Sequence, residues 1–125
     1  MNNQEAFNIM YAHALAMPSQ SGKNTGGGSC LYRSVFYGEP NCCLVGKLIP
    51  DELYKPEMEE RMVKNLIREF IDIQVLFEGV DEVLLWKCQG AHDSFAELTT
   101  HSWRIHMLDQ LHAIASEYGL TVPQE

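Results

Sequence analysis

The chain has 125 residues, of which 46% are hydrophobic and 21% charged, and its formal net charge is -8. A chain of this length buries enough apolar surface for one core, and its composition lies outside the range of disordered proteins. The acidic residues concentrate between residues 51 and 100, where twelve Asp and Glu accompany five Lys and Arg. Because nucleic-acid binding needs a basic surface, this distribution argues against DNA or RNA as a ligand. We predict one domain over residues 1–125.

No apolar run approaches the roughly 20 residues that a membrane span requires. The first residues also lack the basic start and apolar centre of a secretory signal. The four cysteines stand at positions 30, 42, 43 and 88, two of them adjacent, which suits reduced thiols better than a disulfide scaffold. We therefore expect a cytoplasmic protein that does not associate with a membrane.

Apolar residues at three- and four-residue steps predict a first helix over residues 3–17, with Asn2 or Asn3 as its cap and Pro18 after its end. Residues 18–29 combine Pro, Ser, Asn and four glycines, a composition that disfavours both helix and central strand. The expected structure of this segment is a flexible surface loop.

Two segments rich in β-favouring residues follow, CLYRSVF at 30–36 and CCLVGKLI at 42–49, separated by the turn-like YGEPN. This arrangement predicts a hairpin whose second strand covers 42–49. After Pro50 and Pro56 the apolar residues return to helical spacing between Met58 and Ile73. This spacing predicts that the chain between Met58 and Ile73 is mainly helical.

A further helix is expected from about Asp81 to about His92. The last one carries an apolar stripe from Trp103 to Tyr118 and ends at Gly119, a favourable residue for a helix C-terminus. The predicted fold is therefore α+β and mainly helical, with a small two-stranded β-hairpin packed on about four helices.

The predicted binding residues centre on Tyr32 and Arg33. Adjacent residues of a strand face opposite sides, so one of the two reaches the surface or a pocket. Arg suits phosphate and planar groups, although pairing with Glu39 or Asp51 would explain it equally well. The complete predicted set of binding residues is Tyr32, Arg33, Asp51, Tyr54 and His92.

The thiols leave two further interpretations open. Cys88 and His92 are four residues apart on a predicted helix and could bind zinc with Cys30 and either Cys42 or Cys43, although the close cysteine pair typical of zinc sites is missing. Cys30 or Cys43 could instead act with His92 in a cysteine-dependent hydrolase. Buried structural thiols explain the same residues, so the sequence assigns no catalytic residue, metal ligand or cofactor.

Three blocks between residues 28 and 60 have a recognisable pattern: GSCLYR at 28–33, CLVGKLIPDELY at 43–54 and PEME at 56–59. The pattern resembles a group of small proteins encoded by tailed bacteriophages and prophages. Residues 88–93, Trp103 and residues 115–120 resemble the end of those proteins more loosely. Cys42 is extra, and Glu60 stands where those proteins have glycine. The resemblance implies a phage protein that acts in the host cytoplasm, and it carries no activity over to this chain.

These observations favour a phage accessory protein that acts by binding rather than by catalysis. It would serve counter-defence by blocking a host protein or by sequestering an anionic, nucleotide-like signal. Tyr32 would stack on such a ligand, Arg33 would pair with it, and the glycine-rich loop would close over it. A cysteine-dependent hydrolase and a structural or assembly component of the virion are the alternatives. The many apolar helices also allow a homodimer.

Overall fold

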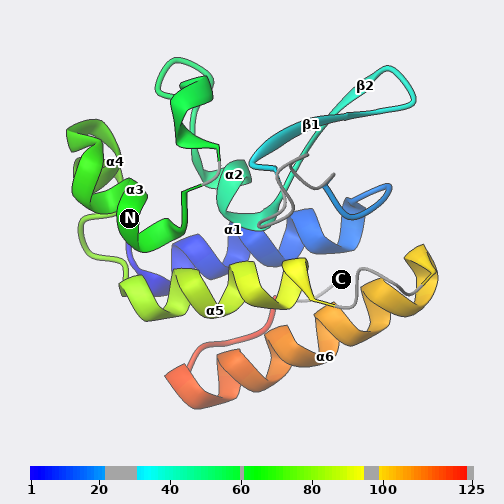
Figure 1. Ribbon diagram of the computed structural model, residues 1–125. Coiled ribbons are helices and arrows are strands. Elements are labelled where there is room, and N and C mark those ends of the chain that lie inside the picture. Colours follow the sequence, from blue (N-terminus) through cyan, green and yellow to red (C-terminus); the bar gives the residue numbers. More distant parts are fainter. Residues whose placement is uncertain (22–30, 60, 95–98, 124–125) are drawn as a thin grey trace.

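The computed structural model describes residues 1–21, 31–59, 61–94 and 99–123, without the side chain of Phe36. These residues form a mainly helical α+β structure, as predicted (Figure 1). Most of the loop predicted at 18–29 lies outside the described residues. The elements are α1 (Asn3–Ala16), β1 (Arg33–Phe36), β2 (Glu39–Cys42), α2 (Leu44–Leu48), the 3-10 turn η1 (Pro56–Met58), α3 (Val63–Glu69), α4 (Ile71–Leu76), α5 (Glu82–Asp93) and α6 (Thr100–Tyr118).

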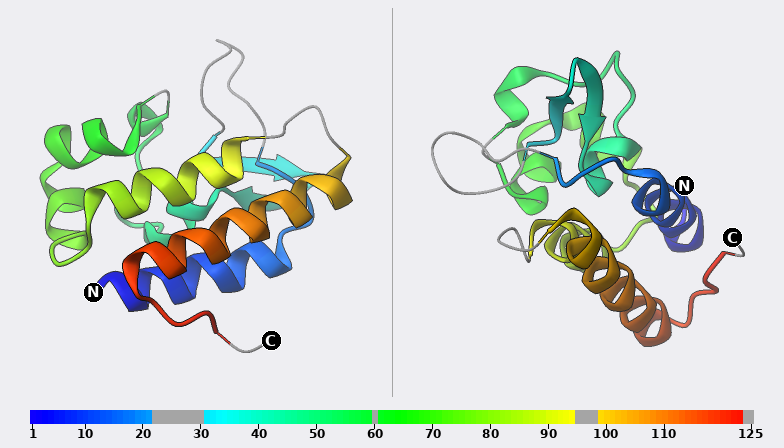
Figure 2. Two further views of the ribbon diagram at one scale, coloured as in Figure 1. Left: turned by 90° about the horizontal axis from the view of Figure 1, so that it is seen from below. Right: turned by 90° about the vertical axis from the view of Figure 1, so that its right-hand side faces the viewer.

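The core lies where the long helices meet. Helix α6 packs against both α5 and α1, and the short helix α2 packs against α1 and α5. Helices α3 and α4 pack on each other at the end of the molecule where α5 begins, whereas the hairpin projects on the side of α2 (Figures 1 and 2). The largest fully buried side chains come from all of these helices, and they include Trp103, Tyr11, Phe7, Leu44, Leu66, Ile73, Leu84 and Met107. The short helices α2, α3 and α4 therefore pack in the same core as the long helices.

The long helices begin and end at the predicted signals. The side chain of Asn2 accepts a hydrogen bond from the Glu5 amide, and the Glu5 carboxylate accepts one from the Asn2 amide, which forms a capping box. Asp81 caps α5 through the amides of the next turn. Gly119 ends α6 with a φ of 66°, a left-handed conformation that glycine adopts at little cost. The predictions of these three helices are confirmed.

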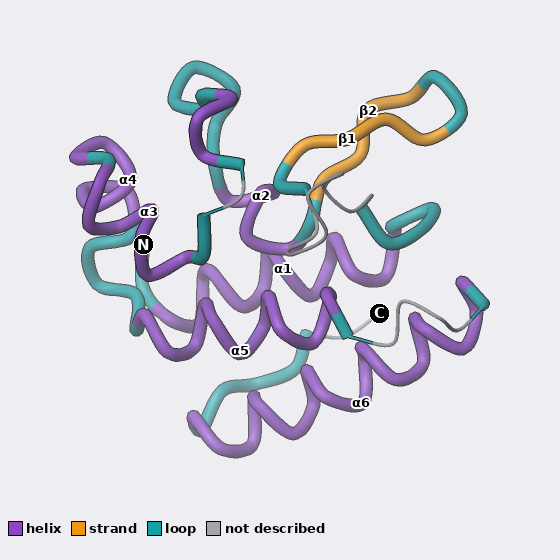
Figure 3. The backbone as a smooth tube through the Cα atoms, viewed as in Figure 1, coloured by secondary structure: helices purple, strands orange, loops and turns teal. Residues whose placement is uncertain are grey.

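The predicted second strand is wrong in position. The hairpin turns at Tyr37 and Gly38, which both have positive φ, as a two-residue hairpin turn requires. Strand β2 is therefore EPNC, paired antiparallel with β1 (Figure 3). In this register Arg33 lies opposite Cys42. The residues that follow form α2 instead of a strand. Four of the five residues of α2 are buried, so the sequence shows a continuous apolar run. The prediction failed because such a run does not distinguish a buried strand from a buried helix.

The segment after Pro56 is helical, as predicted, but interrupted. The backbone is extended at Glu59, Met62 and Phe70, so the apolar stripe is divided between η1, α3 and α4. Glu59 leaves the helical path because its carboxylate binds backbone amides at the start of the hairpin. This tertiary contact overrides the local preference of the segment for one continuous helix.

None of the described helices is both long enough and apolar enough to cross a membrane.

Candidate functional site: a polar cleft between the hairpin and helix α2

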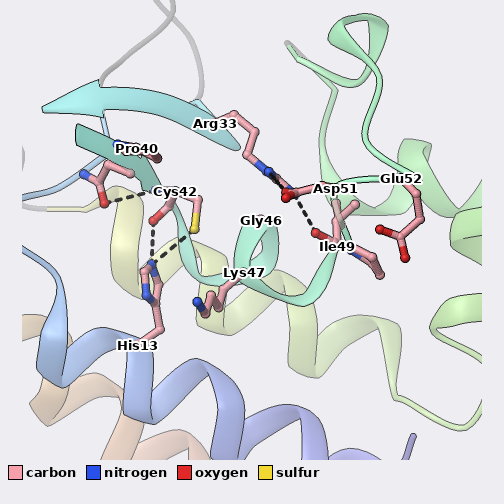
Figure 4. Close-up of a pocket in the computed structure, with 11 residues that line it drawn as sticks. His13, Arg33, Pro40, Cys42, Gly46, Lys47, Ile49, Asp51 and Glu52 are labelled. Carbon is pink, nitrogen blue, oxygen red and sulfur yellow. Dashed lines mark hydrogen bonds and ion pairs between the residues drawn. The ribbon is translucent and has the colours of Figure 1, made fainter. Parts of the chain in front are cut away.

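A cleft of about 450 Å³ lies between the hairpin, α2 and the C-terminal part of α1 (Figure 4). Apolar parts of its wall come from Pro40, Ile49 and Pro50. The titratable and charged side chains that line it are His13, Arg33, Cys42, Lys47, Asp51 and Glu52. The cleft therefore contains Arg33 and Lys47, two of the three Lys and Arg residues in the first fifty positions.

The guanidinium of Arg33 is fixed on three sides. Nη1 donates to the Asp51 carboxylate at 2.5 Å, and Nη2 donates to the Ile49 carbonyl at 2.6 Å. The group also lies over the ring of Tyr54, 4.9 Å from its centroid, in a cation–π contact. Its Nε is buried and has no hydrogen-bond partner among the described atoms. Arg33 is thus held at the cleft wall by contacts that do not depend on Asp51 alone.

Glu59 anchors the strand that carries Arg33. Its Oε1 accepts from the Tyr32 amide at 2.9 Å, and its Oε2 accepts from the Arg33 amide at 3.1 Å and from the Tyr54 hydroxyl at 2.6 Å. Burial, with the neighbouring Glu59 carboxylate, raises the pKa of Tyr54, so its hydroxyl stays protonated and donates. One carboxylate therefore positions both Arg33 and the ring on which the guanidinium rests.

His13 and Cys42 face each other at the other end of the cleft (Figure 4). His13 Nε2 is 2.8 Å from the Cys42 carbonyl oxygen and 3.5 Å from the Cys42 sulfur. Since a carbonyl only accepts hydrogen bonds, Nε2 must carry the proton, and it cannot take one from the thiol. Burial also raises the pKa of the Cys42 thiol, an effect that Lys47 and Arg33 oppose. The pair is therefore not arranged as a nucleophile and its base.

The environment of His13 makes a prediction about pH. Burial lowers the pKa of His13, and Lys47 adds to this effect, whereas the hydrogen bond to Cys42 opposes it. The unfolded chain, with a His pKa of about 6.5, then binds the proton more tightly than the folded protein. We expect the free energy of unfolding to lose a contribution from His13 as the pH falls below 6.5.

The measurement compares urea unfolding of wild type and His13→Gln between pH 8 and pH 5. At pH 8 the two free energies of unfolding should differ by a fixed amount, because His13 is neutral in both states there. Below pH 6.5 that difference should change in favour of the variant, which has no imidazole to protonate. Parallel curves over the whole range would show that His13 does not contribute in this way.

Lys47 is exposed in the last turn of α2 and lines the same cleft. Among the ion pairs found in the described part of the chain, none involves Lys47, whereas Arg33 is paired with Asp51. Glu52 lies beyond Asp51, away from Lys47 and His13 (Figure 4). The end of the cleft near His13 thus has an ammonium group without a neutralising carboxylate among the described residues.

Three of the five predicted binding residues meet at this cleft: Arg33 and Asp51 line it, and Tyr54 supports Arg33. Tyr32 does not, because it is only 3% exposed and its hydroxyl donates to the Arg61 carbonyl. The predicted alternation explains this difference, since Tyr32 enters the core where Arg33 faces the cleft. The expected stacking of Tyr32 on a ligand is therefore wrong.

The last predicted binding residue, His92, lies in the core and is fully buried. Its Nδ1 is 2.8 Å from the Asp93 carboxylate, its Nε2 accepts from the Ser21 amide at 3.1 Å, and its ring meets Trp103 edge-on. The two nitrogens are thus used within the protein, one donating and one accepting. His92 is a structural residue, not a binding residue of the cleft.

The remaining thiols are shielded. Cys43 is fully buried at the start of α2, where its sulfur accepts from the Gly46 amide, and burial raises its pKa well above the usual value. Burial likewise raises the pKa of Cys88 to about 12. Within the described residues no three His, Cys, Asp or Glu side chains are placed to hold a metal ion. Cys30, which the zinc and hydrolase interpretations both used, lies outside the described residues.

Sequence reasoning missed His13 and Lys47. His13 follows Met10 by three residues and precedes Met17 by four, so it flanks the apolar stripe of the first helix. A polar residue in such a place is a signal of a polar contact with another part of the fold. Lys47 fell within the predicted second strand, and its place in the cleft depends on that segment being helix α2. No local pattern shows that these two residues meet Arg33.

A second hollow, of about 430 Å³, lies between α5 and α6 and is mainly apolar. Trp86, which is 50% exposed, stands at its edge, and Gly90, Ala113 and Ile114 form much of its wall. The one charged residue among the described residues that line it, Lys87, pairs with Glu117 at 2.5 Å. In the described part of the chain, more charged side chains thus line the polar cleft than this hollow.

The comparisons with known proteins identify no relative. No protein-family model matches the chain, and neither a curated protein nor a solved structure is significantly similar to it.

Proposed function

We propose that this protein acts by binding a small anionic ligand in the polar cleft, without catalysing a reaction. The observation that supports this most is that the Arg33 guanidinium and the Lys47 ammonium line one cleft of about 450 Å³. That volume is within the range of small-molecule sites, and a few fixed polar groups beside apolar walls are typical of such sites. In an infected bacterial cell, binding of this kind would sequester an anionic, nucleotide-like signal.

The chemistry of the cleft favours an oxyanion. Arg33 is preorganised by Ile49 and Tyr54, so little of its freedom is lost on binding, and an arginine suits carboxylate and phosphate oxygens. Lys47 supplies a second positive charge on a flexible stem. The apolar surfaces of Pro40 and Ile49 are available for a ring or a short carbon chain. The acidic neighbours Asp51 and Glu52 favour a ligand with few negative charges over a polyanion.

Binding is a better explanation than cysteine catalysis because of the state of the described thiols. Cys43 and Cys88 are buried with raised pKa values, and Cys42 faces a protonated imidazole nitrogen. A nucleophilic cysteine needs the opposite, a lowered pKa and an adjacent base.

The test is a comparison of Lys47→Glu with wild type, using native mass spectrometry and calorimetric titration against AMP, cyclic AMP, pyrophosphate and citrate. Wild type should bind at least one of these anions, and Lys47→Glu should bind it at least about tenfold more weakly, because an attraction becomes a repulsion. Lys64→Glu is the matched control, since Lys64 is exposed on α3 and does not line the cleft. Absence of binding by wild type, or equal losses in both variants, would contradict the proposal.

A further inference from the structure

We propose that Asp51 is an internal competitor for the ligand: its carboxylate occupies, on the Arg33 guanidinium, the place that the anionic group of the ligand takes. This inference rests on the proposed function, because it concerns the same cleft. It also states the ligand class more narrowly, as an oxyanion, carboxylate or phosphate, that replaces a carboxylate on an arginine.

The two partners of this ion pair differ in how firmly they are held. The Asp51 side chain is 90% exposed, whereas that of Arg33 is 29% exposed. Arg33 keeps its hydrogen bond to the Ile49 carbonyl and its contact with the Tyr54 ring when Asp51 moves away. The carboxylate can therefore rotate into solvent while the guanidinium stays in position.

The contact between them is of the kind that a ligand can replace. A single oxygen of Asp51 approaches Arg33, at Nη1, and no second hydrogen bond between the two side chains is present. Ion pairs between exposed side chains contribute little to stability, so an incoming oxyanion exchanges one such contact for another. The displaced Asp51 carboxylate stays near the cleft and repels the ligand.

Removing the charge of Asp51 should then strengthen binding. For Asp51→Asn we expect roughly three- to tenfold tighter binding of the anion that wild type binds, because neither the exchange nor the repulsion opposes it. Inorganic phosphate, AMP and succinate serve as probes in isothermal titration at 20 mM NaCl. A gain for phosphate and AMP alone identifies a phosphoryl ligand, and a gain for succinate alone identifies a carboxylate.

Glu57→Gln is the matched control for net charge. Glu57 is exposed on η1 and does not line the cleft, so this variant should bind within about twofold of wild type, as expected for a change outside the contact. Thermal unfolding of each variant, followed by circular dichroism, checks that the fold is kept. The exposed position of Asp51 makes a large loss of stability unexpected.

The outcomes separate this inference from the proposed function. If wild type binds and Asp51→Asn binds equally or more weakly, Asp51 orients Arg33 instead of competing for it, and the inference is overturned while the proposed function stands. An equal gain in Glu57→Gln would overturn it too, because net charge alone would then explain the effect. If neither wild type nor Asp51→Asn binds any probe at 10 mM, both proposals fail.

Discussion

Replacing Gly46 with alanine is expected to lower the free energy of unfolding by about 3 kcal/mol or more. A Cβ atom at this position would lie 2.3 Å from the Tyr32 carbonyl oxygen, and 3.1 and 3.2 Å from the carbonyl carbon and Cα of the same residue. These are backbone atoms, and Tyr32 is fixed by its buried side chain and by the bond from its amide to Glu59. Helix α2 and the hairpin would therefore have to separate.

Gly90→Ala provides the matched control. Gly90 lies within α5 and is exposed, and no atom of the described residues lies within 4 Å of a Cβ added there, apart from its own helix backbone and chain neighbours. This substitution should raise the free energy of unfolding by about 0.5–1 kcal/mol, because alanine loses less backbone entropy in a helix. Urea unfolding of the two variants and wild type measures both effects. Equal stabilities of Gly46→Ala and wild type would mean that α2 does not approach Tyr32 so closely.

Replacing Glu59 with alanine is expected to cost about 2–4 kcal/mol. The change removes the acceptor of the Tyr32 and Arg33 amides and of the Tyr54 hydroxyl in one step. Hydrogen bonds to a charged group are stronger than neutral ones, but Glu59 is only half-buried, so water replaces part of what is lost. The start of the hairpin, and with it Arg33, should become less well fixed.

Two measurements test this effect. Urea unfolding gives the loss of stability, and amide hydrogen exchange should become faster at Tyr32 and Arg33 than in wild type. Glu57→Ala, at an exposed site two residues earlier, should stay within about 0.5 kcal/mol of wild type. Unchanged exchange at the two amides in Glu59→Ala would contradict the role that we assign to this carboxylate.

The local parts of the fold were determined by the sequence. Helix α1 begins at Asn2, α5 begins at Asp81, and α6 ends at Gly119. These ends are predictable because capping hydrogen bonds and left-handed C-termini involve residues two to five positions apart. For α1 and α6, apolar spacing likewise predicted which face is buried. A hairpin at residues 30–49 was also predictable in kind. The turn predicted at residues 37–41 contains the actual turn at Tyr37 and Gly38, but its last three residues belong to β2.

Only the tertiary structure decided where the second strand lies and which residues meet at the cleft. Leu44–Leu48 is a helix because α1 and α5 bury it, and Glu59 interrupts a helical segment to bind the hairpin. The cleft joins His13 to Cys42, 29 positions apart, and Arg33 to Asp51, 18 positions apart. Such contacts depend on how elements pack, which periodicity and composition do not encode, and so the sequence alone identified Arg33 and Asp51 but not His13 and Lys47.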